Sequence, residues 1–203
     1  MHIVDGALSG PVVIGGAVLA AADIAQGLRH LPVEKIPAAG VLSATFFVAS
    51  LVHVPIGPSS VHLILNGLAG LVLGWAAFPA LFVGLLLQAV FFGFGGVTVL
   101  GVNTFDIAAP AVLVGILCRR GLAGPPAVAA IWGAVGGALA IALTTLCVGV
   151  ALSLSGEEFI PAAKLVFLAH IPVMAVEAAI TAAAVSLVRQ VRPELFSVME
   201  AAR

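Results

Sequence analysis

Long apolar runs alternate along the chain with short polar breaks, and each run has about the length of a membrane-spanning helix. Crossing the hydrocarbon core of a bilayer takes about 20 apolar residues, or somewhat fewer where neighbouring helices bury the segment. Clusters of Gly, Pro and charged residues cut the 203-residue chain into seven such runs. The pattern predicts an all-α, polytopic membrane protein in one integral membrane domain over residues 1–203. The predicted spans are residues 11–27, 37–52, 60–77, 79–95, 106–118, 125–153 and 161–188.

Composition points to lipid as the main solvent of the chain. Hydrophobic residues make up 62% of it and charged residues 8%, whereas a soluble domain is about 25% charged. The formal net charge of -1 leaves no basic surface to neutralise a row of phosphates, which excludes nucleic acid as a main partner. Cys118 and Cys147 stand inside apolar runs and form neither a CxxC pair nor a disulfide framework, so we interpret them as packing residues.

The placement of Lys and Arg predicts the orientation, because cytoplasmic loops accumulate these residues. With seven spans, all the Lys and Arg residues except Lys164 fall on one side of the membrane, and Lys164 falls on the other side, near Glu157 and Glu158. We therefore expect the N-terminus outside and inserted toward the core, and the C-terminus in the cytoplasm. The first residues contain no Lys or Arg, so we expect no signal peptide to be removed. With seven spans, one side would collect Arg29, Lys35, Arg119, Arg120, Arg189, Arg192 and Arg203.

The first residues offer an unusual set of metal ligands. A free α-amine, the amide nitrogen of His2 and Nδ1 of its imidazole can chelate one ion through adjacent five-membered and six-membered rings. Such nitrogen-rich, tetragonal coordination suits Ni(II) and Cu(II), and can suit low-spin Co(II). His62 is the best candidate for a fourth nitrogen. We predict it in the first helical turn of the third span, with Asn66 one turn later on the same face.

The other polar residues have plainer interpretations. His53 is expected at the membrane interface and His30 in a solvated loop. The Gly-rich residues 93–103 lack the GK[ST] ending of a nucleotide loop, so their glycines are expected to let the backbone approach another segment. Asp106 is expected to cap the fifth span. Glu177 is an intramembrane acid without an identifiable partner, and structural pairing and function remain equally open for it.

Three motifs together carry a resemblance to a known family. They are the start Met1-His2-Ile3-Val4-Asp5-Gly6, the stretch Pro55-Ile56-Gly57-Pro58-Ser59-Ser60-Val61-His62, and the stretch from Gln88 that ends in Gly95-Gly96-Val97-Thr98-Val99-Leu100-Gly101-Val102-Asn103. In this combination they resemble the CbiM/NikM proteins, the cobalt and nickel uptake S components of energy-coupling factor (ECF) transporters. The resemblance covers most of the chain and is strongest before residue 120.

The resemblance implies a site, a cargo and partners. The family binds its ion through the terminal amine, the second-residue histidine and a helix histidine, which fall on Met1, His2 and His62, while Asn103 has a supporting role. The cargo would be Co2+ for cobalamin synthesis, with Ni2+ as the alternative, and the subunit would need no cofactor. Its partners would be a transmembrane coupling subunit (T component), cytoplasmic ATPase subunits and a small accessory subunit of the inner membrane. Where the family commonly reads Asn-Met, this chain has Asp106 and Ile107, so no ligand role is carried over to Asp106.

Two other classes of function remain open. A membrane-embedded metalloprotease would need a constellation such as HExxH on a helix, which the sequence lacks. A channel or gradient-driven carrier that acts alone would take up metal without any ATPase. The chain has no nucleotide motif of its own, so we expect it to be a non-enzymatic transport subunit whose energy comes from a partner.

Overall fold

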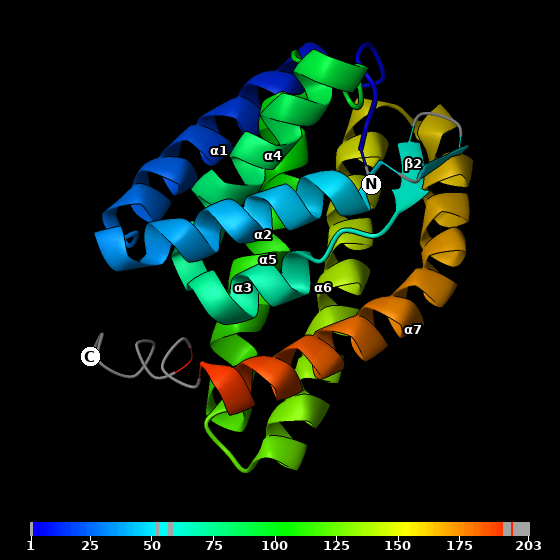
Figure 1. The fold of residues 1–203 in the computed structure, drawn as a ribbon. Coiled ribbons are helices and arrows are strands. Elements are labelled where there is room, and N and C mark those ends of the chain that lie inside the picture. The colour runs from blue at the N-terminus through cyan, green and yellow to red at the C-terminus, as the bar shows by residue number, and fades with distance from the viewer. Residues whose placement is uncertain (1, 52, 57–58, 193–195, 197–203) are drawn as a thin grey trace.

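The computed structural model describes residues 2–51, 53–56, 59–192 and 196, and most of them are helical (Figure 1). Two short strands, β1 (His53–Ile56) and β2 (Ser59–His62), form an antiparallel pair. The helices are α1 (Gly10–Arg29), α2 (Ile36–Ala49), α3 (Asn66–Leu73), α4 (Ala77–Phe92), α5 (Leu100–Leu122), α6 (Pro126–Ser155) and α7 (Ile160–Val191). There are also three short 3-10 turns among the described residues: η1 (Val33–Lys35) directly before α2, η2 (Gly74–Ala76) directly before α4, and η3 (Glu157–Phe159) directly before α7.

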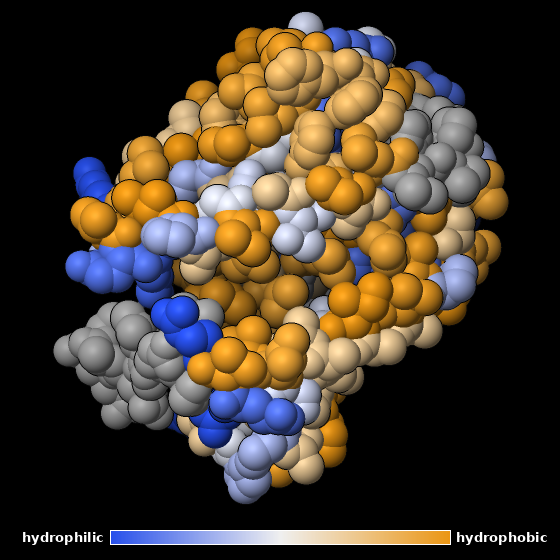
Figure 2. Space-filling view, in the orientation of Figure 1, coloured by the Kyte–Doolittle hydropathy of each residue, from blue (hydrophilic) through white to orange (hydrophobic). Residues whose placement is uncertain are grey.

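The predicted helical membrane protein is confirmed. Five helical stretches of the described residues are long and apolar enough to cross a bilayer: α1, α3 with α4, α5, α6, and η3 with α7. Proline occupies the first turn of α1, α2, α6 and α7, where its missing N–H costs no hydrogen bond. On the face shown in Figure 2, apolar residues cover most of the described surface, and the most hydrophilic residues lie toward its edges. The chain is therefore a multi-pass membrane protein.

The third predicted span, residues 60–77, is wrong as a continuous helix. Its first residues form β2, so His62 ends a strand instead of standing in a helical turn. The helix begins at Asn66, directly after Leu65, whose φ of 56° is left-handed, and it ends at Gly74, whose φ is 58°. α3 is consequently only eight residues long. The apolar run after His62 is compatible with a buried strand or a helix, and periodicity alone does not separate the two.

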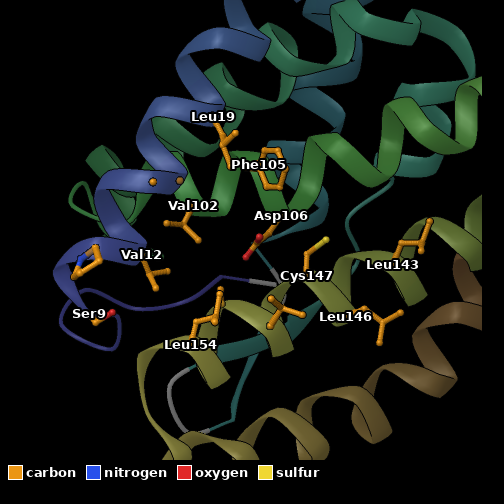
Figure 3. Close-up of a pocket in the computed structure, with 15 residues that line it drawn as sticks. Ser9, Val12, Leu19, Val102, Phe105, Asp106, Leu143, Leu146, Cys147 and Leu154 are labelled. Carbon is orange, nitrogen blue, oxygen red and sulfur yellow. The ribbon is translucent and has the colours of Figure 1, made fainter.

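The fifth span begins earlier than its prediction. α5 starts at Leu100, so Asp106 is an interior helix residue and caps nothing. Asp106 is buried, and its side chain lies beside a cavity of about 700 Å³ between α1, α5 and α6 (Figure 3). Cys147 of α6 lines the same cavity. The residues from Leu100 to Asn103 belong to the Gly-rich stretch of the sequence, but they already form the first turn of α5.

The short helix α3 lies at the centre of the packing, between α5 and α6. A side chain at Gly70 would collide with the carbonyl oxygen of Ala111, so glycine is required for this close approach of α3 to α5. α6 and α7 pack against each other along much of their length, while α1 packs on α5 and α2 on α4 (Figure 1). The crossing of α3 over its neighbours leaves the β1–β2 hairpin and the N-terminal segment together on one side of the core.

Candidate metal site

The N-terminal segment runs back into the molecule and ends beside β2 (Figure 1). His2 is 2% exposed and Ile3 is fully buried. Asn103, at the start of α5, holds this segment with two hydrogen bonds: its Oδ1 accepts from the Ile3 N–H at 2.8 Å, and its Nδ2 donates to the Ile3 carbonyl at 3.0 Å. The Asp5 N–H donates to the Gly95 carbonyl at 2.8 Å. The Gly-rich stretch thus receives the terminus, as the sequence predicted for its glycines.

Gly96 makes that close approach possible. Its φ of 115° favours glycine, and any side chain there would collide with the carboxylate of Asp5. The same carboxylate accepts a hydrogen bond from the Thr98 hydroxyl at 2.5 Å. These contacts fix the chain on both sides of Ile3, so the position of His2 is set by its neighbours.

His2 and His62 face each other in the interior. Nδ1 of His2 lies 3.2 Å from Nε2 of His62, and the ring centroids are 4.6 Å apart. Both side chains are almost completely buried. The structure therefore brings together two residues that are 60 positions apart and that the sequence selected as ligands.

Main-chain and amide oxygens fix the tautomers of this histidine pair. Nε2 of His2 lies 2.6 Å from Oε1 of Gln88, and Nδ1 of His62 lies 2.6 Å from the carbonyl oxygen of Leu63. An amide oxygen only accepts, so each of these nitrogens carries the proton, and a neutral imidazole has only one. In this tautomer Nδ1 of His2 and Nε2 of His62, which lie 3.2 Å apart, are the two nitrogens that can bind a metal ion.

The 3.2 Å separation also fits adjacent corners of a square-planar metal site. Metal–nitrogen bonds are about 2.0 Å long, which places neighbouring nitrogens of a square about 2.8 Å apart. In the predicted chelate the fourth ligand stands opposite the His2 amide nitrogen, and thus adjacent to its imidazole. The observed distance between Nε2 of His62 and Nδ1 of His2 is about 0.4 Å longer than this expected separation. An adjustment of that size is smaller than a typical side-chain rearrangement on binding.

Glu177 holds the chain directly after His62. Its Oε1 accepts hydrogen bonds from the N–H groups of Ile64 at 2.5 Å and Leu65 at 2.9 Å. These main-chain groups stand at the break between β2 and α3, where neither a sheet nor a helix supplies an acceptor. Glu177 is fully buried on α7, so its partner, which the sequence left open, is the backbone that carries His62.

The remaining predicted residues lie elsewhere or outside the description. Met1 is not among the described residues, and His53 is described only as the strand residue that pairs with His62 in the hairpin. His30 is exposed, and its Nδ1 donates to the Gln26 carbonyl at 2.9 Å, which fits the predicted loop histidine. In the described part of the chain no three His, Cys, Asp or Glu side chains form a metal-binding cluster.

Gln88 is the residue that the sequence interpretation missed. In the sequence it only opens the third motif, whereas in the structure it is fully buried on α4 and its Oε1 lies 2.6 Å from Nε2 of His2. The available signal was a single amide side chain within the apolar run 79–95, where a polar group needs a partner inside the protein.

The fold and this site define a class of protein: a multi-pass membrane protein that brings its own N-terminal histidine to a second histidine in its interior. Residues 2–195 match the family model described as CbiM, the cobalt uptake substrate-specific transmembrane region. The chain belongs to this family, whose members are transmembrane components for the uptake of transition metals.

Individual relatives agree with the family. A protein of Haemophilus influenzae whose name assigns it to metal transport is 42% identical, and the match covers 97% of each chain. The fused nickel transport protein NikMN of Rhodobacter capsulatus is 39% identical over 53% of this chain and 33% of its own. The crystal structure of a truncated transition metal transporter superposes with a TM-score of 0.74 at 28% identity, covering 94% of this chain and 99% of that one.

Proposed function

We propose that this chain is the substrate-capture subunit of an ATP-driven, ECF-type importer for Co2+, in which Met1, His2 and His62 hold the ion and Asn103 supports the site. The observation that carries the proposal is the histidine pair: Nδ1 of His2 and Nε2 of His62 lie 3.2 Å apart, and both side chains are buried. A divalent ion can bind both nitrogens at once after a small adjustment. The matched family description and the transition metal transporter structure support the same cargo class.

Each residue has a distinct part in the proposed capture step. The α-amine of Met1 and the amide and Nδ1 of His2 form the chelate, and His62 closes the square from the hairpin. Asn103 keeps the chelate in register by clamping Ile3 on both its N–H and its carbonyl. Loss of the amide proton leaves a negative charge on the chelate, which partly neutralises the divalent ion inside a low-dielectric interior.

Cobalt is favoured over nickel by the description of the matched family. The nitrogen ligands alone favour nickel, because affinity rises from Co(II) to Ni(II) along the general series for divalent metals. A nickel-specific subunit of the same type is therefore the second candidate, and the name of the Rhodobacter capsulatus relative supports it.

The energy for uptake is proposed to come from partners. The chain carries no nucleotide-binding motif, and we propose that a transmembrane coupling subunit and cytoplasmic ATPases drive transport, with a small accessory membrane subunit. That relatives are named as fused transport proteins supports assembly with a further membrane component. The chain itself is proposed to be non-enzymatic and free of any cofactor.

We infer seven membrane passes, with the N-terminus outside and the C-terminus in the cytoplasm of the inner membrane. The chain reverses at η2, between α3 and α4. Trp75 of η2 lines a recess together with Arg29, whereas Gln88 at the other end of α4 contacts His2, so α4 runs back toward the histidine pair. The third pass is completed by the hairpin, since α3 alone is about 12 Å long. With an odd number of passes, the histidine pair and the C-terminal cations lie on opposite sides of the membrane. The positive-inside rule assigns the cations to the cytoplasmic side and so places the histidine pair near the outer side.

Uptake and binding together test the proposal. Vesicles that contain the chain, the coupling subunit and the ATPases should accumulate Co2+ only with internal ATP. Titration of the purified chain with Co(II) should show at least a tenfold weaker affinity for His62→Ala than for the loop control His30→Ala. Accumulation by the chain alone without ATP would instead indicate a carrier, and equal affinities of the two variants would remove His62 from the site.

A further inference from the structure

Basic side chains surround a recess at the end of the molecule opposite the histidine pair. The recess has a volume of about 590 Å³ and lies where α1 ends, η1 and η2 turn, and α5 approaches its last turn. Arg29, Lys35 and Arg119 line it together with His30, and none of the acidic residues that the structure describes does. Three cations from three separate elements therefore border one volume.

The charges of these cations are not balanced by the described residues. None of Arg29, Lys35 and Arg119 forms an ion pair there, and Nη2 of Arg119 is shielded from solvent without any hydrogen-bond partner in that part of the chain. Lys35 is half-buried, and this burial lowers its pKa with no acid to offset the effect. Like charges that converge in a partly dry recess repel each other, and a shielded guanidinium N–H without an acceptor is costly. An anion in the recess would relieve both costs.

The walls of the recess are apolar and lead outward to the lipid. Leu73 and Val112 form a buried floor, while Ile116 lines the recess and is 57% exposed on the outer surface of α5. Trp75, an amphipathic ring of the kind found at membrane interfaces, also lines it. A small soluble anion would use the cations but not this apolar wall. A molecule with an anionic head and apolar tails would use both.

We propose that the recess binds the phosphate headgroup of an anionic membrane phospholipid, with Arg29, Lys35 and Arg119 around the phosphate and the acyl chains along Ile116. Guanidinium groups match phosphate oxygens with paired hydrogen bonds, and Arg119 has an unused N–H for one of them. Basic pockets between transmembrane helices on the cytoplasmic side are a known setting for such headgroups. The lipid would tie α1, η1 and α5 together at the end of the molecule that faces the proposed ATPase partners.

The test compares two lipids with the same acyl chains on the purified full chain. Native mass spectrometry should show that dioleoylphosphatidylglycerol is retained in preference to dioleoylphosphatidylcholine. Arg119→Gln should weaken phosphatidylglycerol binding about fivefold, and the double variant with Arg29→Gln about 25-fold, since each cation near a lipid surface contributes about 1 kcal/mol. Arg120→Gln is the matched control, because Arg120 is the exposed neighbour of Arg119 and does not line the recess. Arg119→Lys should keep most of the binding.

Each other outcome overturns the proposal. Equal retention of the two lipids, or equal losses in Arg119→Gln and Arg120→Gln, would show that the recess is not a headgroup site. Displacement of phosphatidylglycerol by millimolar inorganic phosphate would show a site for a soluble anion. If the recess instead receives an acidic segment of a coupling subunit, the isolated chain will show no lipid preference, and Arg119→Gln will weaken only assembly with that subunit.

Discussion

The amide oxygen of Gln88 lies 2.6 Å from Nε2 of His2 and thereby leaves Nδ1 of His2 free of a proton. Replacing Gln88 with Ala removes this acceptor, so the imidazole can rotate or carry its proton on Nδ1. Loss of such an outer contact typically weakens metal binding by about 10–100-fold. Co(II) titration of Gln88→Ala against the exposed control Gln190→Ala measures the effect. A Gln88→Ala protein that binds as tightly as the control would mean that His2 is positioned by other contacts.

Glu177 stabilises the junction between β2 and α3. In Glu177→Ala the N–H groups of Ile64 and Leu65 lose their acceptor inside the protein, at about 1–3 kcal/mol for each unsatisfied group. Thermal unfolding in detergent should therefore begin at a clearly lower temperature. Glu177→Gln keeps one acceptor oxygen and should lose less stability. The comparison is with exposed Glu157→Ala, and unfolding of Glu177→Ala at the same temperature as this control would contradict the assigned role.

The topology predicts which end of each helix is accessible from which side. Single cysteines at positions 29 and 157, in a chain whose Cys118 and Cys147 are replaced, should react with a membrane-impermeant thiol reagent from opposite sides. Position 29 should react from the cytoplasm and position 157 from outside. Labelling of both positions from one side would show that the number of passes between them is even.

Binding should strengthen as the pH rises, and the slope identifies the ligands. Two of the proposed ligands, the α-amine and the His2 amide nitrogen, must each release a proton when the ion binds. An α-amine has a pKa of about 7.7–8.0 and must lose its proton first, and the amide nitrogen releases one at any pH. The dissociation constant should therefore fall about 100-fold per pH unit below pH 7.7 and about tenfold above it. Calorimetry in two buffers gives the number of protons released, and a value near zero at pH 7 would argue against the terminal chelate.

The sequence predicted the helices whose ends are marked by proline and charge. α1, α6 and α7 lie within three residues of their predicted spans, since Pro and Arg delimit apolar runs there. The hairpin was missed because its short strands, β1 and β2, contain Pro and Ser and lack the alternation of apolar and polar residues that marks a strand. The two prolines between His53 and His62 were the signal against a helix in this stretch.

The candidate site was predictable in its ligands but not in its supports. A histidine at position two has a chelating chemistry that the sequence shows directly, whereas the partners of Gln88 and Glu177 lie 86 and 113 residues away. A single polar residue in an apolar run indicates only that a partner exists inside the membrane domain. Which partner it is depends on how α4 and α7 pack, and the hydrophobic pattern does not determine that.

The N-terminus is the most direct test of the account, because the chelate requires a free amine on the residue directly before His2. One glycine inserted between Met1 and His2 enlarges the chelate ring and moves the imidazole away from Nε2 of His62, and an N-terminal tag removes the amine. Neither change alters a helix, so both proteins should fold. The measurement is Co(II) titration of the native, glycine-inserted and tagged proteins at one pH. We predict that each altered protein binds at least ~10–100-fold more weakly than the native one. Unchanged affinity of the tagged protein would contradict it and would leave His2 without a role as a ligand of this chelate.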